Sequence, residues 1–140
     1  MTYSVHQRTA SVNGVDLVVH ESGDHGAPLI ILAHGFPETA HSWRHQMIPL
    51  AEAGYHVIAP NQRGYGRSSV PKNVDAYSTT DLALDLLHLA EQAGHEKTIY
   101  VGHDWGACCY GTCVACTQNE CVLAPQSVFR LPIGQWHQLN

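Results

Sequence analysis

The chain has 140 residues, which is enough for one domain of ordinary size. Hydrophobic residues make up 44% of it and charged residues 14%, so it can build an apolar core and wholesale disorder is excluded. A formal net charge of −5, with 7 Lys+Arg, speaks against a nucleic-acid or anionic-membrane surface. No apolar run approaches the ~20 residues of a membrane span, and the polar start lacks the apolar stretch of a secretory signal. We therefore expect a cytoplasmic protein without membrane or nucleic-acid partners, whose oligomeric state stays open.

The first elements along the chain are a predicted two-strand hairpin and a buried strand. HQRTASV (6–12) and VDLVVHE (15–21) alternate polar and apolar residues around Asn13-Gly14, a pair typical of tight hairpin turns. The apolar run PLIILAH (28–34) is too short for a helix and predicts a strand that is buried on both faces.

A helical stretch and a further strand follow. Four apolar residues recur at helical spacing, namely Trp43, Met47, Leu50 and Ala51. Pro49 is expected to start a second helical piece, which Gly54 ends. The apolar run YHVIAP (55–60) predicts another buried strand, and it leads into the glycine-rich loop NQRGYGRSS (61–69).

The clearest helix is predicted over residues 78–93, with Gly94 as its stop. One face of this helix is apolar and consists of Leu82, Leu86, Leu89 and Ala93. Another face is polar and consists of Asp81, Asp85, His88 and Gln92. The run TIYVGH (98–103) predicts the next strand. A hairpin followed by strand, helix, strand, helix and strand predicts an α/β protein whose sheet is mostly parallel, with an antiparallel first hairpin.

Three unusual loops follow the predicted parallel strands: HGFPE (34–38), NQRGYGRSS (61–69) and GHDWGA (102–107). In open parallel sheets, binding and chemistry gather at the carboxyl ends of the strands. The coincidence of these loops predicts an active site at that edge of the sheet.

The segment Gly102-His103-Asp104-Trp105-Gly106 has the form G-x-nucleophile-x-G. In such a nucleophile elbow the central side chain is exposed on a strained turn between a strand and a helix. The flanking glycines are needed because a Cβ would collide with the neighbouring strand and helix. The helix that follows stabilises negative charge at its N-terminus. Asp104 is therefore the candidate nucleophile; the alternative is that it is a plain helix N-cap.

An aspartate at this position suits displacement at an sp³ carbon. Its carboxylate is ionised at neutral pH and attacks without a base. The product is an ester of Asp104, which water must cleave at the Asp104 carbonyl. The backbone N–H groups of Phe36 and Trp105 are the expected oxyanion-hole donors for that step.

From about residue 5 to residue 107 the chain resembles the amino-terminal half of an α/β-hydrolase of the epoxide hydrolase group. The motifs that carry the resemblance are HGFPE (34–38), SWRHQ (42–46), GYHVIAPNQRGYGRSS (54–69) and VGHDWGA (101–107). The resemblance implies hydrolysis of an epoxide to a vicinal diol through an Asp-bound ester, with epoxide and water as partners. It requires neither a cofactor nor a metal.

The resemblance also implies supporting roles around the nucleophile. His34 and Gly35 belong to the oxyanion loop, which His34 supports, and Phe36-Pro37 is expected to be a cis peptide that shapes it. Gly102, His103 and Gly106 complete the elbow.

Haloalkane and haloacetate dehalogenases are the alternative, because they share the aspartate nucleophile. Haloalkane dehalogenases usually carry a polar residue in place of Phe36, and haloacetate dehalogenases tend to carry Arg in place of Trp105, so the epoxide hydrolases match better. One departure is Asn61, where the family usually has Asp, and we expect it to weaken any pairing with Arg63 or Arg67. The same loop is also compatible with turn glycines and solvated arginines.

The resemblance stops after Ala107. The following tail contains all five cysteines, at positions 108, 109, 113, 116 and 121. Their odd number argues against a disulfide framework, and the single CxxC pair (113–116) lacks a second pair for a zinc site. We leave residues 108–140 as an unassigned, irregular tail and interpret its abrupt composition as a change of reading frame, which the coding DNA would test.

The tail bears on function as well. The family's catalytic histidine, its acidic partner and two lid tyrosines lie beyond the matching region, and His137 has no similar context. We expect a chain truncated before the lid and later strands, with residues 98–103 as an exposed apolar edge. A non-catalytic fragment is therefore a second hypothesis for this chain.

The 11 histidines are scattered along the sequence. The pair His41 and His45 is four residues apart but lacks a nearby acidic or cysteine partner, so no metal site is expected.

Overall fold

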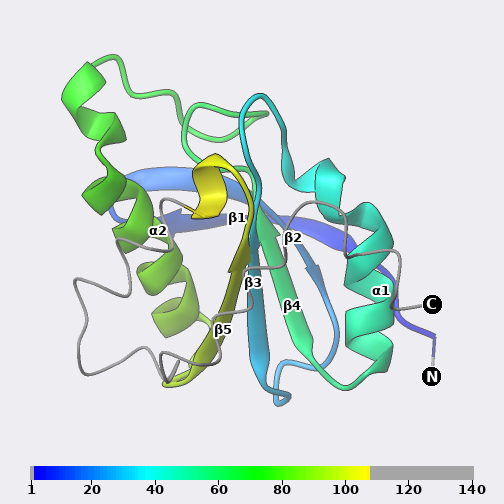
Figure 1. Ribbon diagram of the computed structural model, residues 1–140. Helices are drawn as coiled ribbons and strands as arrows, with labels where there is room; N and C mark the ends of the chain where they lie inside the picture. Colours follow the sequence, from blue (N-terminus) through cyan, green and yellow to red (C-terminus); the bar gives the residue numbers. More distant parts are fainter. Residues whose placement is uncertain (1, 108–140) are drawn as a thin grey trace.

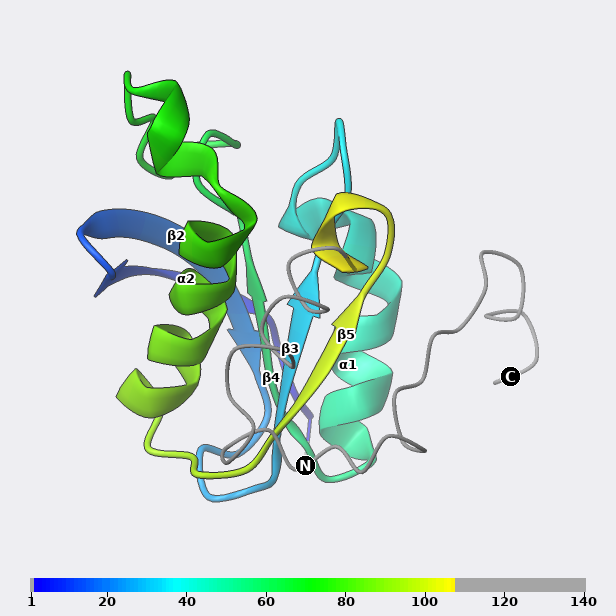
Figure 2. The ribbon, with the colours of Figure 1, turned by 60° about the vertical axis from the view of Figure 1, so that its left-hand side comes forward.

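The structure is a computed structural model that describes residues 2–107; the predictions for the cysteine-rich tail and for His137 lie outside this range. The described part is an α/β fold with two helices packed on opposite faces of one sheet (Figures 1 and 2). Its strands are β1 (His6–Val12), β2 (Val15–Ser22), β3 (Leu29–Ala33), β4 (His56–Pro60) and β5 (Thr98–Gly102). Its helices are the 3-10 helix η1 (Ala40–Trp43), α1 (Arg44–Glu52), the 3-10 helix η2 (Val74–Tyr77) and α2 (Thr79–Gln92).

The sheet has five strands in the order β1-β2-β4-β3-β5. β1 pairs with β2, and β2 with β4, in antiparallel fashion, while β3 is parallel to both β4 and β5. This arrangement confirms the predicted fold class. The hairpin turn forms at Asn13 (φ 49°) and Gly14 (φ 75°), the two left-handed residues that the right-handed twist of a tight hairpin favours.

Alternate residues of the central strands supply two apolar cores. On one face, Leu29 and Ile31 of β3 pack with the apolar side of α2, which includes Leu86 and Leu89. On the other face, Ile30 and Leu32 of β3 pack with a cluster from η1, α1 and β4 that includes Trp43 and Met47. Both faces of β3 are therefore covered, which explains why its sequence is continuously apolar.

The expected break at Pro49 is wrong. Pro49 lies inside the single helix α1, and the piece that precedes this helix is η1 rather than a separate α-helix. Pro49 itself is exposed, while Met47 and Ala51 are buried against the sheet, and this burial holds the helix together across the proline. The predicted stop is confirmed, because Gly54 has a φ of 93° and Tyr55 N–H donates to the carbonyl of Leu50.

The helix predicted over residues 78–93 is confirmed as α2. The Ser78 hydroxyl accepts a hydrogen bond from the N–H of Asp81 and caps the first turn. At the other end, Gly94 (φ 79°) is left-handed and His95 N–H donates to the carbonyl of Ala90.

A buried ion pair joins the loop after β4 to α2. Arg63 donates from Nε to Asp85 Oδ2 (2.7 Å) and from Nη2 to Asp85 Oδ1 (2.6 Å), and both side chains are only 4% exposed. Asn13 Nδ2 also donates to Asp85 Oδ1. The hydrogen bonds that Arg63 donates to Asp85 raise the pKa of Arg63 above its ordinary value.

These contacts correct the expectation for Asn61. Its Oδ1 accepts from the N–H of Ala40 (2.8 Å), and it is not the partner of the loop arginines. Arg63 pairs with Asp85, and Arg67 donates to Gln7. The amide at position 61 therefore fastens the loop to η1 and leaves the arginine pairing intact.

Among the helices of residues 2–107, none has the length and apolar character needed to span a bilayer.

Replacement of Asp85 by Ala should strongly destabilise the fold, because it leaves the buried guanidinium of Arg63 without its counter-charge. We expect a loss of about 3–5 kcal/mol in the free energy of unfolding, measured by urea denaturation followed by circular dichroism. Asp75→Asn, at an exposed carboxylate of η2, is the matched control and should change this value by less than about 0.5 kcal/mol. Equal effects of the two substitutions would contradict the importance of the ion pair.

Candidate active site

The three loops singled out in the sequence lie together at the carboxyl ends of the parallel strands, at the top of Figure 1. The loop after β3 carries Phe36 and Pro37, and the turn after β5 carries Asp104. The register of β3 and β5 pairs Ala33 with Gly102, so the two chain segments leave the sheet side by side. Phe36-Pro37 is a cis peptide, as the resemblance implied.

Asp104 lies on a strained turn. Its φ is 51°, in the left-handed region that only a few per cent of non-glycine residues adopt. Gly106 N–H donates to the carbonyl of His103 (3.0 Å) and Ala107 N–H to that of Asp104 (3.1 Å), so a helical turn begins at once. Asp104 is thereby exposed at the tip, at the N-terminal end of this turn.

Three glycines allow the backbone segments around Asp104 to approach closely. A Cβ on Gly106 would lie 2.3 Å from the carbonyl oxygen of Ala33, and one on Gly102 would lie 2.7 Å from the carbonyl carbon of Gly106. A Cβ on Gly35 would lie 2.7 Å from the Cβ of Asp104. No other residue fits these positions without displacing backbone, which accounts for the glycines of both motifs.

The two expected oxyanion donors bind the Asp104 carboxylate itself. Phe36 N–H donates to Asp104 Oδ2 at 2.9 Å. The hydrogen bonds from the backbone N–H groups of Phe36 and Trp105 lower the pKa of Asp104 below its ordinary value. Asp104 is therefore ionised at neutral pH, with one oxygen anchored by the loop after β3.

His34 is a fully buried support of the same loop. Its Nε2 accepts from the backbone N–H of Gln62 (3.0 Å), so its Nδ1 carries the proton and donates to the carbonyl of Gly35 (2.9 Å). Gln62 Nε2 donates in turn to the carbonyl of His34 (2.6 Å). Burial lowers the pKa of His34, which keeps the ring neutral in this tautomer. Because both ring nitrogens are occupied, His34 positions the loop and is unsuited to proton transfer.

His103 braces the elbow against the loop after β3. Its Nε2 lies 2.8 Å from Glu38 Oε2, and its ring meets that of Trp43 edge-on at 5.4 Å between centroids. Glu38 was not among the site residues expected from the sequence. The sequence offered one indication of its role, namely its position next to Pro37. Its partner His103 could not be predicted, because it lies 65 residues away in the sequence.

An open cleft of about 650 Å³ begins beside Asp104. Its lining consists of Phe36, Arg63, Gly64, Tyr65, Val70, Tyr77, Leu82 and Trp105. The side chains of Phe36 and Val70 are 70% and 66% exposed there, an unusual degree for apolar residues. The phenol of Tyr77 already donates to the carbonyl of Pro71. The cleft thus offers an apolar surface next to an anchored carboxylate.

The mixed five-stranded sheet and the strand–turn–helix at Asp104 define the amino-terminal part of an α/β-hydrolase fold. The family model that describes the alpha/beta hydrolase fold matches residues 28–122. The chain belongs to the α/β-hydrolase fold family, and within it to the epoxide hydrolase family.

The relatives and solved structures agree with this placement. Epoxide hydrolase A of Mycobacterium tuberculosis is 56% identical over 101 residues, which are 72% of this chain and 31% of that protein. An epoxide hydrolase of Caballeronia sordidicola is 41% identical over 107 residues, 76% of this chain and 32% of that protein. The crystal structure of epoxide hydrolase A from Mycobacterium thermoresistibile is similar with a TM-score of 0.82 and 47% identity, over 84% of this chain and 37% of that one.

An epoxide hydrolase from Vigna radiata is similar with a TM-score of 0.79 and 34% identity, over 84% of this chain and 38% of that one. The chain therefore spans about a third of the length of the curated relatives it matches.

Gly106→Ala should displace the elbow, because its new Cβ would overlap the carbonyl of Ala33 at the end of β3. We expect a loss of about 1–3 kcal/mol in the free energy of unfolding, measured by urea denaturation. Gly26→Ala is the control, since a Cβ there meets no atom closer than 3.6 Å, and it should stay within about 0.5 kcal/mol of the parent. An unchanged stability of Gly106→Ala would show that the close approach is not required.

Proposed function

We propose that Asp104 is the nucleophile of an epoxide hydrolase reaction, and that this chain supplies the part of the enzyme that captures the epoxide. The observation that carries the proposal is the hydrogen bond from Phe36 N–H to Asp104 Oδ2. It holds one carboxylate oxygen in place and leaves the other to attack. Homology to epoxide hydrolases and the apolar cleft beside the carboxylate support the same substrate class.

In the capture step, Asp104 Oδ1 attacks one carbon of the epoxide ring. A new carbon–oxygen bond forms, the ring carbon–oxygen bond breaks, and the ring oxygen keeps the electron pair as an alkoxide, which takes a proton from water and becomes a hydroxyl group. The product is a hydroxyalkyl ester of Asp104, in which Oδ2 is the carbonyl oxygen. Phe36 N–H and Trp105 N–H already point at the carboxylate in the resting state, so little rearrangement is needed.

In the release step, water adds to the ester carbonyl and Oδ2 becomes negatively charged. The two backbone donors stabilise this oxyanion, which then collapses to regenerate the carboxylate and free the diol. Release requires a base to activate the water, and capture is faster with an acid that protonates the alkoxide. His34 is occupied at both nitrogens, so it does not serve as this base.

The resemblance implies a base, its acidic partner and proton-donating tyrosines in the part of the protein that follows residue 107. We therefore propose that capture belongs to residues 2–107 and that turnover belongs to the whole protein. The apolar ring of Phe36, exposed in the cleft, favours an epoxide over a haloalkane, because it offers no hydrogen bond to a departing halide.

Incubation of the 140-residue chain with styrene oxide, after its cysteines have been alkylated, should add the mass of one epoxide molecule to Asp104 as an ester. Asp104→Asn should abolish this adduct, since an amide is a poor nucleophile, while Asp24→Asn at an exposed carboxylate should leave it unchanged. Peptide mass spectrometry measures both. An adduct that persists in Asp104→Asn would refute the role of Asp104, and sustained diol production by this chain would refute the division between capture and turnover.

The rate of adduct formation should stay constant as the pH falls from 7 to about 4. An ordinary aspartate has lost half of its ionised form at about pH 3.9. Because the pKa of Asp104 is lowered, its nucleophilic form persists through this pH and is lost only further into acid. Rates are corrected with Asp104→Asn for uncatalysed ring opening. A rate that halves above pH 3.9 would contradict the anchoring of the carboxylate by Phe36 and Trp105.

A further inference from the structure

A second cluster of polar side chains lies at the opposite end of the sheet from Asp104. Glu21 is near the end of β2, His56 begins β4, and His25 lies in the loop that joins β2 to β3. Since β3, β4 and β5 are parallel, the amino end of β4 lies at the bottom of Figure 1, whereas the elbow lies at the top. One oxygen or nitrogen atom of each of the three side chains lies within 4.8 Å of the other two.

The atoms face one another in a compact arrangement. Glu21 Oε1 lies 2.6 Å from His56 Nε2 and 3.8 Å from His25 Nδ1. The two imidazole rings are 4.6 Å apart between centroids. Glu21 and His56 are buried, whereas the His25 side chain is 74% exposed and provides access from solvent.

The backbone fixes the loop that carries His25. Gly23 has a φ of 93°, and a Cβ on it would lie 2.1 Å from the carbonyl oxygen of Tyr55. Only glycine permits this approach, which presses the loop against the start of β4 and sets His25 over His56. The fold thus holds Glu21 and His56 in place and fixes the backbone of the loop that carries the exposed side chain of His25.

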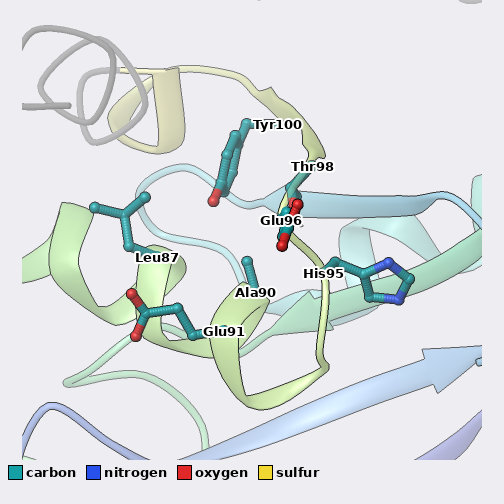
Figure 3. A pocket seen from close by; sticks show the side chains of 7 residues that line it. All are labelled: Leu87, Ala90, Glu91, His95, Glu96, Thr98 and Tyr100. Carbon is teal, nitrogen blue, oxygen red and sulfur yellow. The ribbon is translucent and has the colours of Figure 1, made fainter. Parts of the chain in front are cut away.

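Glu21 and His56 also have hydrogen-bond partners outside the cluster of Glu21, His25 and His56. Arg8 Nε donates to Glu21 Oε2, and Arg8 Nη2 makes a longer hydrogen bond of 3.5 Å to Oε1, the oxygen that faces His56 and His25. His56 Nδ1 lies 3.4 Å from His95 Nε2, in the turn between α2 and β5. Figure 3 shows His95 beside a pocket of about 30 Å³ at this end of α2, a volume that suits a water molecule and no larger ligand. Metal-bound histidines commonly donate their second ring N–H to an acceptor, as His56 Nδ1 can to His95 Nε2, and this hydrogen bond fixes the orientation of the ring.

We propose that Glu21, His25 and His56 bind one divalent transition-metal ion, through Glu21 Oε1, His25 Nδ1 and His56 Nε2. Two imidazoles and one carboxylate are a donor set that Zn²⁺ accepts in tetrahedral geometry, with water in the fourth position. Ligand atoms of such a site lie about 3.3 Å apart, given metal–ligand bonds of about 2.0–2.1 Å. The 2.6 Å and 3.8 Å separations bracket this value, so small side-chain movements suffice.

The site is independent of the chemistry at Asp104. A bound ion would join the β1–β2 hairpin to the parallel strands, because its ligands come from β2, β4 and the loop between β2 and β3. The guanidinium of Arg8 opposes the incoming charge, but this side chain is 36% exposed and water screens it. We therefore expect weaker binding than at a zinc site with an unpaired carboxylate.

Zn²⁺ binding to the full 140-residue chain, with its cysteines alkylated, tests the proposal by isothermal titration calorimetry. The parent should bind one equivalent, and His25→Ala should weaken this binding at least about tenfold, because it removes an exposed ligand without disturbing the core. His45→Ala, at an exposed histidine of α1, is the matched control and should bind as the parent does.

Thermal unfolding provides a second readout. Zn²⁺ should raise the midpoint for the parent and for His45→Ala but not for His25→Ala, since an ion that binds only the folded state stabilises it. Circular dichroism of the metal-free proteins checks that His25→Ala is folded. Absence of binding to the parent, unchanged affinity in His25→Ala, or an equal loss in His45→Ala would each overturn the proposal.

Discussion

The close approach of the β3 and β5 termini is the constraint on which the candidate active site depends. One hydrogen bond, from Phe36 N–H to Asp104 Oδ2, joins residues 68 positions apart in the sequence. It forms only because the parallel register sets Ala33 opposite Gly102 and because residues 35, 102 and 106 lack a Cβ. The apolar core beneath β3 and β5 fixes the register, so the packing of the sheet determines the geometry of a carboxylate at its edge.

A series of polar contacts connects α2 to the edge of the sheet at which Asp104 lies. Asp85 of α2 holds Arg63, and the neighbouring Gln62 holds His34, whose ring in turn holds the carbonyl of Gly35. Each of these side chains is buried, so each hydrogen bond replaces one to water that burial has removed. Breaking one contact would leave its partner unsatisfied in the interior, which costs more than the bond itself contributes. The loops around Asp104 are therefore held as one unit.

Local patterns in the sequence were sufficient to predict the strands, α2 and the elbow, because each depends on residues close together in the chain. Alternation defined the hairpin, a short apolar run defined β3, and the G-x-D-x-G spacing defined the turn at Asp104. The continuous helix through Pro49 was not predictable, since the burial of Met47 and Ala51 outweighs the local preference of proline.

The sequence also did not predict which buried polar side chains pair, such as Arg63 with Asp85 and Glu21 with His56. These pairs depend on which strands and helices become neighbours in the fold.

The arrangement around Asp104 also separates the two stages of the proposed reaction physically. Among residues 2–107, β5 pairs with β3 alone. Every described contact that orients the carboxylate comes from the β3 side or from the elbow's own turn: Phe36, Gly35 and Trp105 around Asp104, and Glu38 against His103. Proton transfer to the departing oxygen and activation of water need groups aimed at the cleft from another direction, and neither His34 nor His103 is oriented for that task because each is engaged in support of a loop. In the proposed reaction, ester formation therefore uses contacts within residues 2–107, whereas ester hydrolysis needs further groups.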